Sequence, residues 1–193
     1  MTDPAPSNQA TRMTASLATV RAFPVPDFEA LFDAELDYVW NALRRLGVRE
    51  ADLDDQVNEV FLRVHGQLDR YDPARPIRPW LFAFAVRVAA EHRRLARNQR
   101  ELLGVPLEAP DPAPGPDEQT EQNEARALVL SALDTLAPDQ RAVFVALDIE
   151  GHSGVEVAEA LGISVNTVYS RQRLAREKFT NSLRRLQKTG VPR

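Results

Sequence analysis

Cysteine is absent from this chain of 193 residues. Its absence excludes disulfide frameworks, thiol nucleophiles and cysteine-ligated zinc. Long apolar runs are lacking too: the longest, Trp80 to Ala90, has 11 residues and contains Arg87, whereas a membrane span needs about 20. Residues 1–26 hold no basic start followed by an apolar stretch, so they do not resemble a secretory signal. We therefore expect a cytoplasmic protein without a membrane segment.

The residue patterns of catalytic and metal sites are also missing. The three histidines, His65, His92 and His152, lie far apart in the sequence and lack zinc-ligand spacing. The aspartates from Asp52 to Asp55 lack the glycine and terminal glutamate of a calcium loop, and no glycine-rich phosphate loop is present. We expect no metal, no cofactor and no enzymatic activity.

Charge of either sign is unevenly distributed, although the formal net charge is only −4. Residues 101–124 contain seven acidic residues and no lysine or arginine, whereas residues 164–193 contain eight basic residues and Glu177 as their one acid. A strongly basic stretch suits a polyanion such as DNA, although it is also compatible with an ordinary solvated surface.

The acidic stretch is rich in proline as well, which interrupts helices and strands and favours an extended chain. It predicts a linker between two small domains. We expect a disordered tail at 1–26, a helical domain at 27–100, the acidic linker at 101–123, a second helical domain at 124–187 and a short tail at 188–193.

Apolar residues recur at helical spacing throughout both predicted domains, and no segment alternates as a half-buried strand does. The first domain should contain helices at about 28–46, 50–68 and 80–97. The second should contain four, at about 124–136, 138–150, 154–161 and 165–186, with a capping box at Ser153 to Glu156. The fold class is therefore predicted to be all-α.

The last two predicted helices, joined by a turn at Gly162, have the spacing of a helix-turn-helix, whose second helix enters the major groove of DNA. Polar and basic residues occupy the first turns of that helix and could contact bases or phosphates. These candidate DNA-binding residues are Asn166, Thr167, Ser170, Arg171, Arg173 and Arg176.

Three segments of the sequence resemble the sigma-70 family of transcription initiation factors. Residues 136–171 resemble its region 4, residues 54–63 its polymerase-binding helix in region 2, and residues 78–83 its Trp-Leu-Phe segment. The presence of only these two regions implies the extracytoplasmic-function (ECF) type. The resemblance implies a factor that binds core RNA polymerase and directs promoter-specific initiation, with region 4 on the −35 element and region 2 on the −10 element.

The resemblance also assigns partners to two parts of the first domain. Cationic and aromatic residues precede and begin its third helix, where they could hold the opened −10 strand by stacking and charge: Arg70, Tyr71, Asp72, Arg75, Arg78 and Trp80. An acidic helix face would contact the clamp coiled coil of the largest polymerase subunit: Asp54, Asp55, Asn58, Glu59 and Phe61. The flap of the second subunit and an anti-sigma factor are further implied partners.

Three residues depart from the family pattern: Gln56 replaces an apolar residue, Arg87 an asparagine, and Asn166 a small residue. Two other functions stay open at this point. A polymerase-independent helix-turn-helix regulator would bind DNA as a dimer and would not need the acidic helix face. A helical scaffold would not need the exposed polar residues of the last helix.

Overall fold

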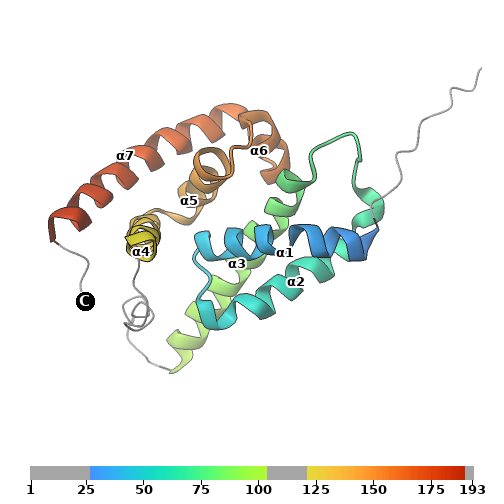
Figure 1. Ribbon diagram of the computed structural model, residues 1–193, viewed down its shortest axis with the longest axis horizontal. Helices are drawn as coiled ribbons and strands as arrows, with labels where there is room; N and C mark the ends of the chain where they lie inside the picture. The colour runs from blue at the N-terminus through green and yellow to red at the C-terminus, as the bar shows by residue number, and fades with distance from the viewer. Residues whose placement is uncertain (1–26, 104–120, 190–193) are drawn as a thin grey trace, which may run out of the picture.

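The computed structural model describes residues 27–103 and 121–189, and every regular element in these two ranges is helical (Figure 1). The all-α prediction is therefore confirmed for this part of the chain. The predicted tail at 1–26, most of the predicted linker and residues 190–193 of the predicted tail at 188–193 lie outside the described residues, whereas residues 188 and 189 belong to the last helix. The predicted division into domains stays a prediction, although α-helix extends to Leu103 on one side of the linker and resumes at Glu121 on the other.

The first half of the chain forms a bundle of α1 (Phe28–Arg45), α2 (Leu53–His65) and α3 (Ile77–Leu103), with short 3₁₀ turns at Glu50–Asp52 and Leu68–Arg70. The three helices pack against one another in pairs. Each contributes fully buried apolar side chains, among them Leu43, Val60 and Phe82. Removal of these side chains from water provides the main stabilisation of the bundle.

Two of these helices differ in length from the sequence prediction. α2 ends at His65 rather than Leu68, because the chain turns at Gly66 and Leu68 begins a separate 3₁₀ turn whose leucine is buried. α3 begins at Ile77 rather than Trp80. Pro79 is tolerated there because the first four N–H groups of a helix have no partner within it, so the N–H that proline lacks is not missed.

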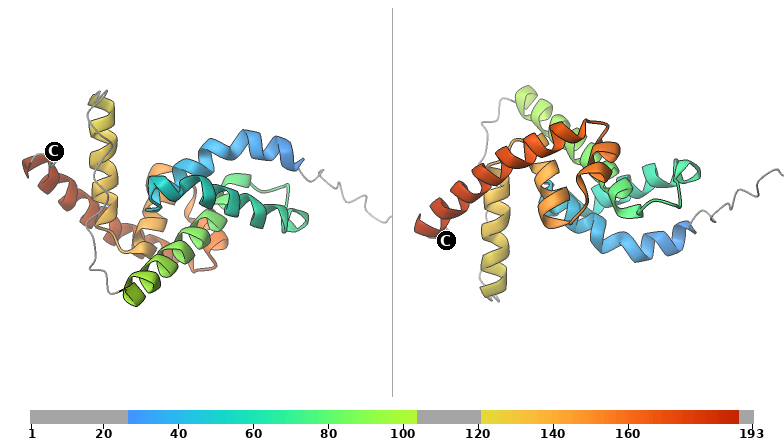
Figure 2. Two further views of the ribbon diagram at one scale, coloured as in Figure 1. Left: turned by 90° about the horizontal axis from the view of Figure 1, so that it is seen from below. Right: turned by 90° about the horizontal axis from the view of Figure 1, so that it is seen from above.

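The second half of the chain contains α4 (Glu121–Asp134), α5 (Pro138–Phe144), a π-helical turn at Val145–Ile149, α6 (Gly154–Leu161) and α7 (Val165–Thr189). Pro138 occupies the first position of α5, as predicted. The long α7 packs against α4, α5 and α6, and Figure 2 shows it extending well beyond the other helices of this half.

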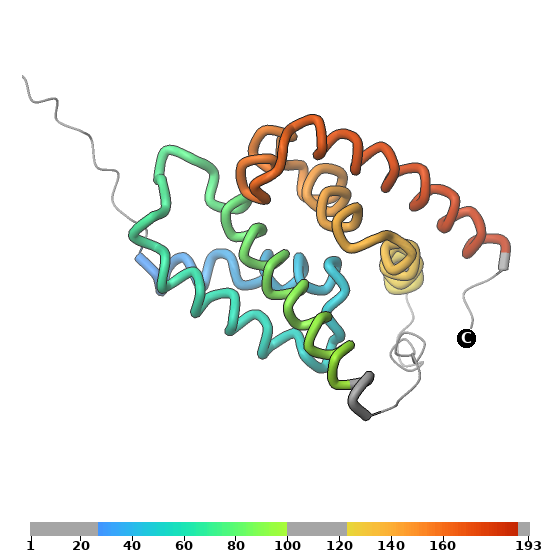
Figure 3. The backbone as a smooth tube through the Cα atoms, turned by 180° about the vertical axis from the view of Figure 1, so that it is seen from behind, coloured from blue at the N-terminus to red at the C-terminus, as the bar shows by residue number. Residues whose placement is uncertain are grey.

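The two halves lie against each other. α6 packs on α3, and Figure 3 shows the loop before α3 rising beside α6. This arrangement places the loop before α3, which is predicted to hold the −10 strand, next to the first helix of the predicted helix-turn-helix.

Candidate nucleic-acid interface

The helix-turn-helix is built from α6, a turn and α7. Ser153 caps α6 through a complete capping box with Glu156, and hydrogen bonds from Ser153 lower the pKa of the Glu156 carboxyl. Gly162 ends α6 in the left-handed conformation, with φ of 67°, a geometry that favours glycine. The Ser164 hydroxyl then accepts a hydrogen bond from the Thr167 N–H at 3.1 Å. These caps fix where α6 ends and α7 begins.

The residues predicted to contact DNA in the first turns of α7 fall into two groups, exposed and half-buried. Asn166, Ser170 and Arg173 are exposed. Arg171 is half-buried and its Nε lies 3.1 Å from a carboxylate oxygen of Asp139. Asn166 and Arg173 make no side-chain hydrogen bond or ion pair with any other described residue, so their polar groups are available to a base or phosphate.

Further along α7, Arg176 donates to Asp148 at 2.6 Å, and Gln172 donates to the other oxygen of the same carboxylate at 3.0 Å. Arg176 therefore already has an acidic partner, as Arg171 does. To bind DNA, each of these two arginines would have to leave its carboxylate partner and pair with a phosphate. Thr167 is half-buried, and its hydroxyl lies 2.8 Å from that of Ser164, so this side chain stabilises the start of α7.

The loop before α3 is ordered by its own polar groups. The Tyr71 hydroxyl donates to the Arg75 carbonyl at 2.5 Å, and the Asp72 carboxylate accepts from the Ala74 N–H at 3.0 Å. Burial raises the pKa of Tyr71, with Asp72 acting in the same direction. Arg70 and Arg75 are exposed. Arg75 already pairs with Asp72 at 3.3 Å and with Glu159 of α6 at 2.5 Å, whereas Arg70 makes no ion pair with another described residue.

Aromatic rings pack against one another beside this loop. The Tyr71 and Trp80 ring centroids are 5.1 Å apart, and Trp80 meets Phe84 edge-on at 4.8 Å. Trp80 is half-buried, so it is held in place by neighbours and still reaches the surface. A ring held in this way can stack on an unpaired base.

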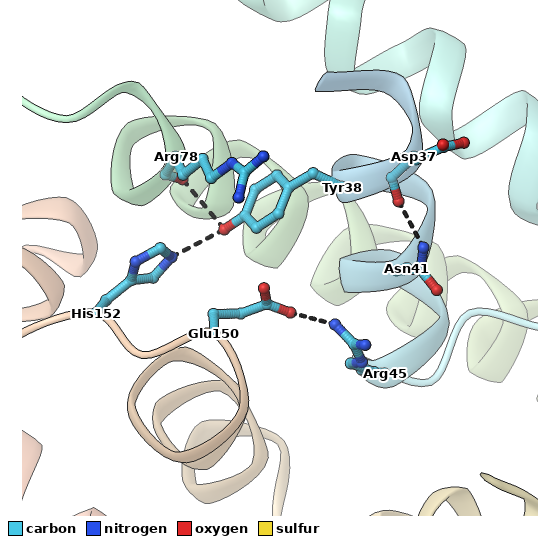
Figure 4. Close-up of polar contacts among 7 residues, drawn as sticks. All are labelled: Asp37, Tyr38, Asn41, Arg45, Arg78, Glu150 and His152. Carbon is cyan, nitrogen blue, oxygen red and sulfur yellow. Dashed lines mark hydrogen bonds and ion pairs between the residues drawn. The ribbon is translucent and has the colours of Figure 1, made fainter. Parts of the chain in front are cut away.

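Arg78 differs from the other loop cations because its side chain is engaged with α1. Its Nε lies 2.9 Å from an oxygen of the nearly buried Glu35 carboxylate, and its guanidinium stands over the Tyr38 ring at 5.0 Å. Figure 4 shows this side chain beside Tyr38, away from Arg45. Arg78 therefore connects α3 to α1.

The predicted acidic face of α2 is exposed at Asp54, Asp55 and Asn58. Glu59 is half-buried and pairs with Arg63, whose guanidinium also reaches Glu91 of α3 at 2.8 Å. These acidic and polar groups stand close together on one side of α2, as a contact surface for a basic partner requires.

Phe61 does not fit the predicted role in polymerase binding. Its side chain is 2% exposed, and its ring packs against Phe28 and Phe32 at 6.4 and 4.6 Å. The exposed apolar residue of this surface is Leu62, with 69% of its area accessible, one position along the helix. We call Asp54, Asp55, Asn58, Glu59 and Leu62 the α2 face.

Sequence reasoning missed a polar cluster between the two halves, formed by Tyr38, Arg45, Glu150 and His152. The Tyr38 hydroxyl lies 2.9 Å from Nε2 of His152, and Arg45 pairs with Glu150 at 2.5 Å (Figure 4). Burial lowers the pKa of His152 and keeps the Tyr38 hydroxyl protonated by raising its pKa. No periodicity or motif connects residues 114 positions apart.

Within the two described ranges, no group of three or more metal-ligating side chains is found, and none of the helices there has the length and apolar character to cross a membrane.

Comparison with known proteins associates both halves with one family. Residues 31–100 match the family model described as Sigma-70 region 2, and residues 126–179 match Sigma-70, region 4. The RNA polymerase sigma factor CnrH of Cupriavidus metallidurans is 35% identical over 147 residues, which cover 72% of this chain and 77% of CnrH. The ECF RNA polymerase sigma factor SigL of Mycobacterium tuberculosis is 33% identical over 167 residues, covering 85% and 91%.

Two solved structures have similar folds. CnrH in complex with the cytosolic domain of CnrY is 31% identical, with a TM-score of 0.58, and the match covers 81% of this chain and 86% of CnrH. The sigma factor RpoE of Bartonella quintana, in complex with the anti-sigma factor NepR, has a TM-score of 0.66 at 20% identity, covering 82% and 97%.

Proposed function

Because the chain belongs to the sigma-70 family of RNA polymerase sigma factors, as an ECF-type member, we propose that its α2 face binds core polymerase while α7 and the loop before α3 contact the promoter. The protein is a promoter-recognising initiation factor. Its function is to assemble polymerase on DNA, and it needs no catalytic group of its own.

One observation carries the proposal: a single chain holds an exposed acidic and apolar helix face in one half and exposed polar residues on a helix-turn-helix in the other. On α7, Asn166 and Arg173 are the proposed base-reading residues, since asparagine pairs well with adenine and arginine with guanine in the major groove. Arg171 and Arg176 are the proposed phosphate contacts of the −35 element.

For the −10 element, we assign the opened strand to the loop before α3. Arg70 and Arg75 would hold phosphates, and Trp80, supported by Tyr71, would stack on an unpaired base. Arg78 would stabilise the loop through its ion pair with Glu35 of α1. In this assignment Arg70, Arg75 and Trp80 contact DNA, whereas Arg78 holds the loop in position.

For the polymerase, we propose that the α2 face meets the basic clamp coiled coil of the largest subunit, with Leu62 at the centre of the contact and Asp55 beside it. Apolar groups surrounded by polar ones are typical of the residues that dominate protein interfaces. The second half of the chain is assigned to the flap of the second subunit.

A regulatory protein partner is also part of the proposal. CnrH, which is 31% identical, is solved in complex with the cytosolic domain of CnrY, and this supports an anti-sigma factor for the present chain. The action of the protein at DNA places it in the cytoplasm.

The function is tested by promoter-dependent transcription with purified bacterial core polymerase, with and without this protein. A variant with Asp55→Lys and Glu59→Lys should lose at least about tenfold in initiation, because reversing two charges at an interface with a basic partner costs more than 1.4 kcal/mol. The matched control is Asp33→Lys with Asp37→Lys, which makes the same charge change at the same spacing on the exposed side of α1.

Initiation at defined start sites, lost with the α2 variant and kept with the α1 variant, is the expected result. An equal loss of initiation in both variants would show that the overall charge of the protein, and not the α2 face, determines the effect. No initiation by the wild-type protein, together with tight duplex binding in the absence of polymerase, would instead indicate the dimeric regulator.

A further inference from the structure

Tyr169 is the one aromatic side chain in the described ranges that is largely exposed, with 51% of its area accessible. The other described aromatic rings are buried or half-buried. Aromatic residues are enriched on surfaces where macromolecules meet, because they offer a large rigid area and, in tyrosine, a polar group. Tyr169 lies on α7 near the proposed base-reading residues, and DNA is therefore the partner that its position suggests.

The register of α7 places Tyr169 among those residues. Val168 and Ala175 are fully buried and mark the side of the helix that packs on the rest of the chain. Successive residues of an α-helix turn by about 100°, so residues three and four positions apart lie along one stripe. Asn166, Tyr169 and Arg173 have this spacing and are all exposed. Tyr169 therefore lies between the two proposed base-reading residues.

The ring of Tyr169 reaches from α7 to the first residue of α6. A Cβ on Gly154 would stand 2.6 Å from the Tyr169 hydroxyl oxygen and 2.7 Å from Cζ. The end of the ring therefore occupies the space that a side chain at position 154 would fill. Gly154 is itself buried. Because this residue has no side chain, the ring has a defined resting place on the start of α6.

The hydroxyl at the end of this ring is available to a further group, since it makes no hydrogen bond with any other residue of 27–103 or 121–189. A phenol can donate and accept a hydrogen bond, and tyrosine is among the side chains that donate to DNA phosphates. In a helix-turn-helix the second helix lies in the major groove, whereas the first crosses the DNA backbone. A hydroxyl held over the start of the first helix, α6, therefore faces a phosphate rather than a base edge.

We propose that Tyr169 is a further DNA-contacting residue of this protein: its hydroxyl donates a hydrogen bond to one phosphate at the edge of the −35 major groove, and Gly154 positions the ring for that contact. The inference rests on the proposed function, which it deepens by naming a contact that fixes α7 in the groove. Phosphate contacts carry no sequence information directly, but they determine the register of the protein on the duplex. Tyr169 thereby sets which bases Asn166 and Arg173 meet.

The contact is tested in the complex of the full chain with core polymerase. Its dissociation constant is measured, by competition with a labelled promoter, for promoter duplexes in which one phosphate of the −35 element at a time is replaced by an uncharged methylphosphonate. Tyr169→Phe removes the hydroxyl and keeps the ring. This variant should bind the unmodified promoter about tenfold more weakly, as expected for the loss of one hydrogen bond to a charged group.

The expected result is a coupling between this hydroxyl and one phosphate. At one backbone position the methylphosphonate should weaken binding of the wild-type protein about tenfold and that of Tyr169→Phe by less than about twofold, while the other positions affect both proteins equally. Equal affinities of the two proteins for the unmodified promoter, or equal effects of the methylphosphonate at every position, would overturn the inference. Failure of the wild-type complex to bind the promoter would instead contradict the proposed function, so the two failures are distinguishable.

A second variant tests the role of Gly154. The Cβ of Gly154→Ala displaces the end of the Tyr169 ring, which can swing into solvent, so the midpoint of thermal unfolding should be nearly unchanged. The variant should lose the coupling to the same phosphate, and its addition to Tyr169→Phe should weaken binding no further. The matched control is Gly66→Ala, where no atom lies closer than 3.7 Å to the added carbon, and it should bind as the wild type does. An intact coupling in Gly154→Ala would overturn the positioning role of Gly154.

Discussion

At the scale of single residues, Gly47 is the position where backbone and packing both require glycine. Its φ is +92°, and a Cβ there would stand 2.9 Å from Nη1 of Arg141. Arg141 cannot move away easily, because it is 7% exposed and its guanidinium is held by the Arg45 carbonyl and Asp134. Burial lowers the pKa of Arg141, and Asp134 opposes this.

We therefore expect Gly47→Ala to destabilise the protein by about 1–3 kcal/mol, measured as a lower midpoint of thermal unfolding. The matched control is Gly66→Ala, at a position with φ of −68° and no atom closer than 3.7 Å to the added carbon. That change should leave stability unchanged or raise it by about 0.4–1 kcal/mol, because alanine restricts the unfolded chain. A similar loss in both variants would contradict this account of Gly47.

At the scale of elements, the start of α6 depends on the capping box of Ser153 and Glu156. Ser153→Ala removes the acceptor of the Glu156 N–H and should cost about 1 kcal/mol of stability. Ser131→Ala, at an exposed position in the interior of α4, should cost nothing, because alanine is the better helix former there. Urea unfolding of both variants measures the difference, and equal midpoints would show that the cap contributes no stability.

The lengths and order of these elements follow from local rules, and much of the fold could be predicted for that reason. Helical spacing, Pro138, the Ser153 cap and Gly162 correctly located the helix-turn-helix. The π-helical turn at Val145–Ile149 could not be anticipated, because periodicity does not distinguish it from an α-helical turn. Phe61 follows the apolar spacing of α2 and is buried in the bundle, so helical periodicity was a better guide to its position than the family resemblance.

The polar cluster between the halves was beyond prediction for a different reason. Tyr38 and His152 are ordinary residues in their own helices and turns, and only tertiary packing brings them together. Contacts between residues this far apart in the sequence depend on the orientation of whole helices. The candidate surfaces could be located from sequence, whereas their mutual placement could not.

At the scale of the whole molecule, the stability of the fold should depend on pH through His152. Burial lowers the pKa of this histidine, Arg78 acts in the same direction, and Glu150 and Glu156 oppose it. In the unfolded chain the ring is hydrated and its pKa returns toward about 6.5. Protons therefore bind more strongly to the unfolded chain, and the free energy of unfolding should decrease as pH falls below about 6.5.

Urea unfolding of the protein from pH 7.5 to pH 5.5 measures this change. His152→Gln should reduce the pH response, because glutamine does not titrate. His65→Gln, on α2 and away from the polar cluster between the halves, should keep it. An unchanged response in His152→Gln would assign the pH dependence to another group.

The ion pair between Arg75 and Glu159 has a consequence for the salt dependence of promoter binding. Arg75, like Arg171 and Arg176, already neutralises a carboxylate in the free protein, so each phosphate contact made by one of these arginines leaves a carboxylate without its partner. The phosphate gives up a bound cation and the freed carboxylate attracts one. These three contacts should therefore add less to the salt dependence of binding than three unpaired arginines would.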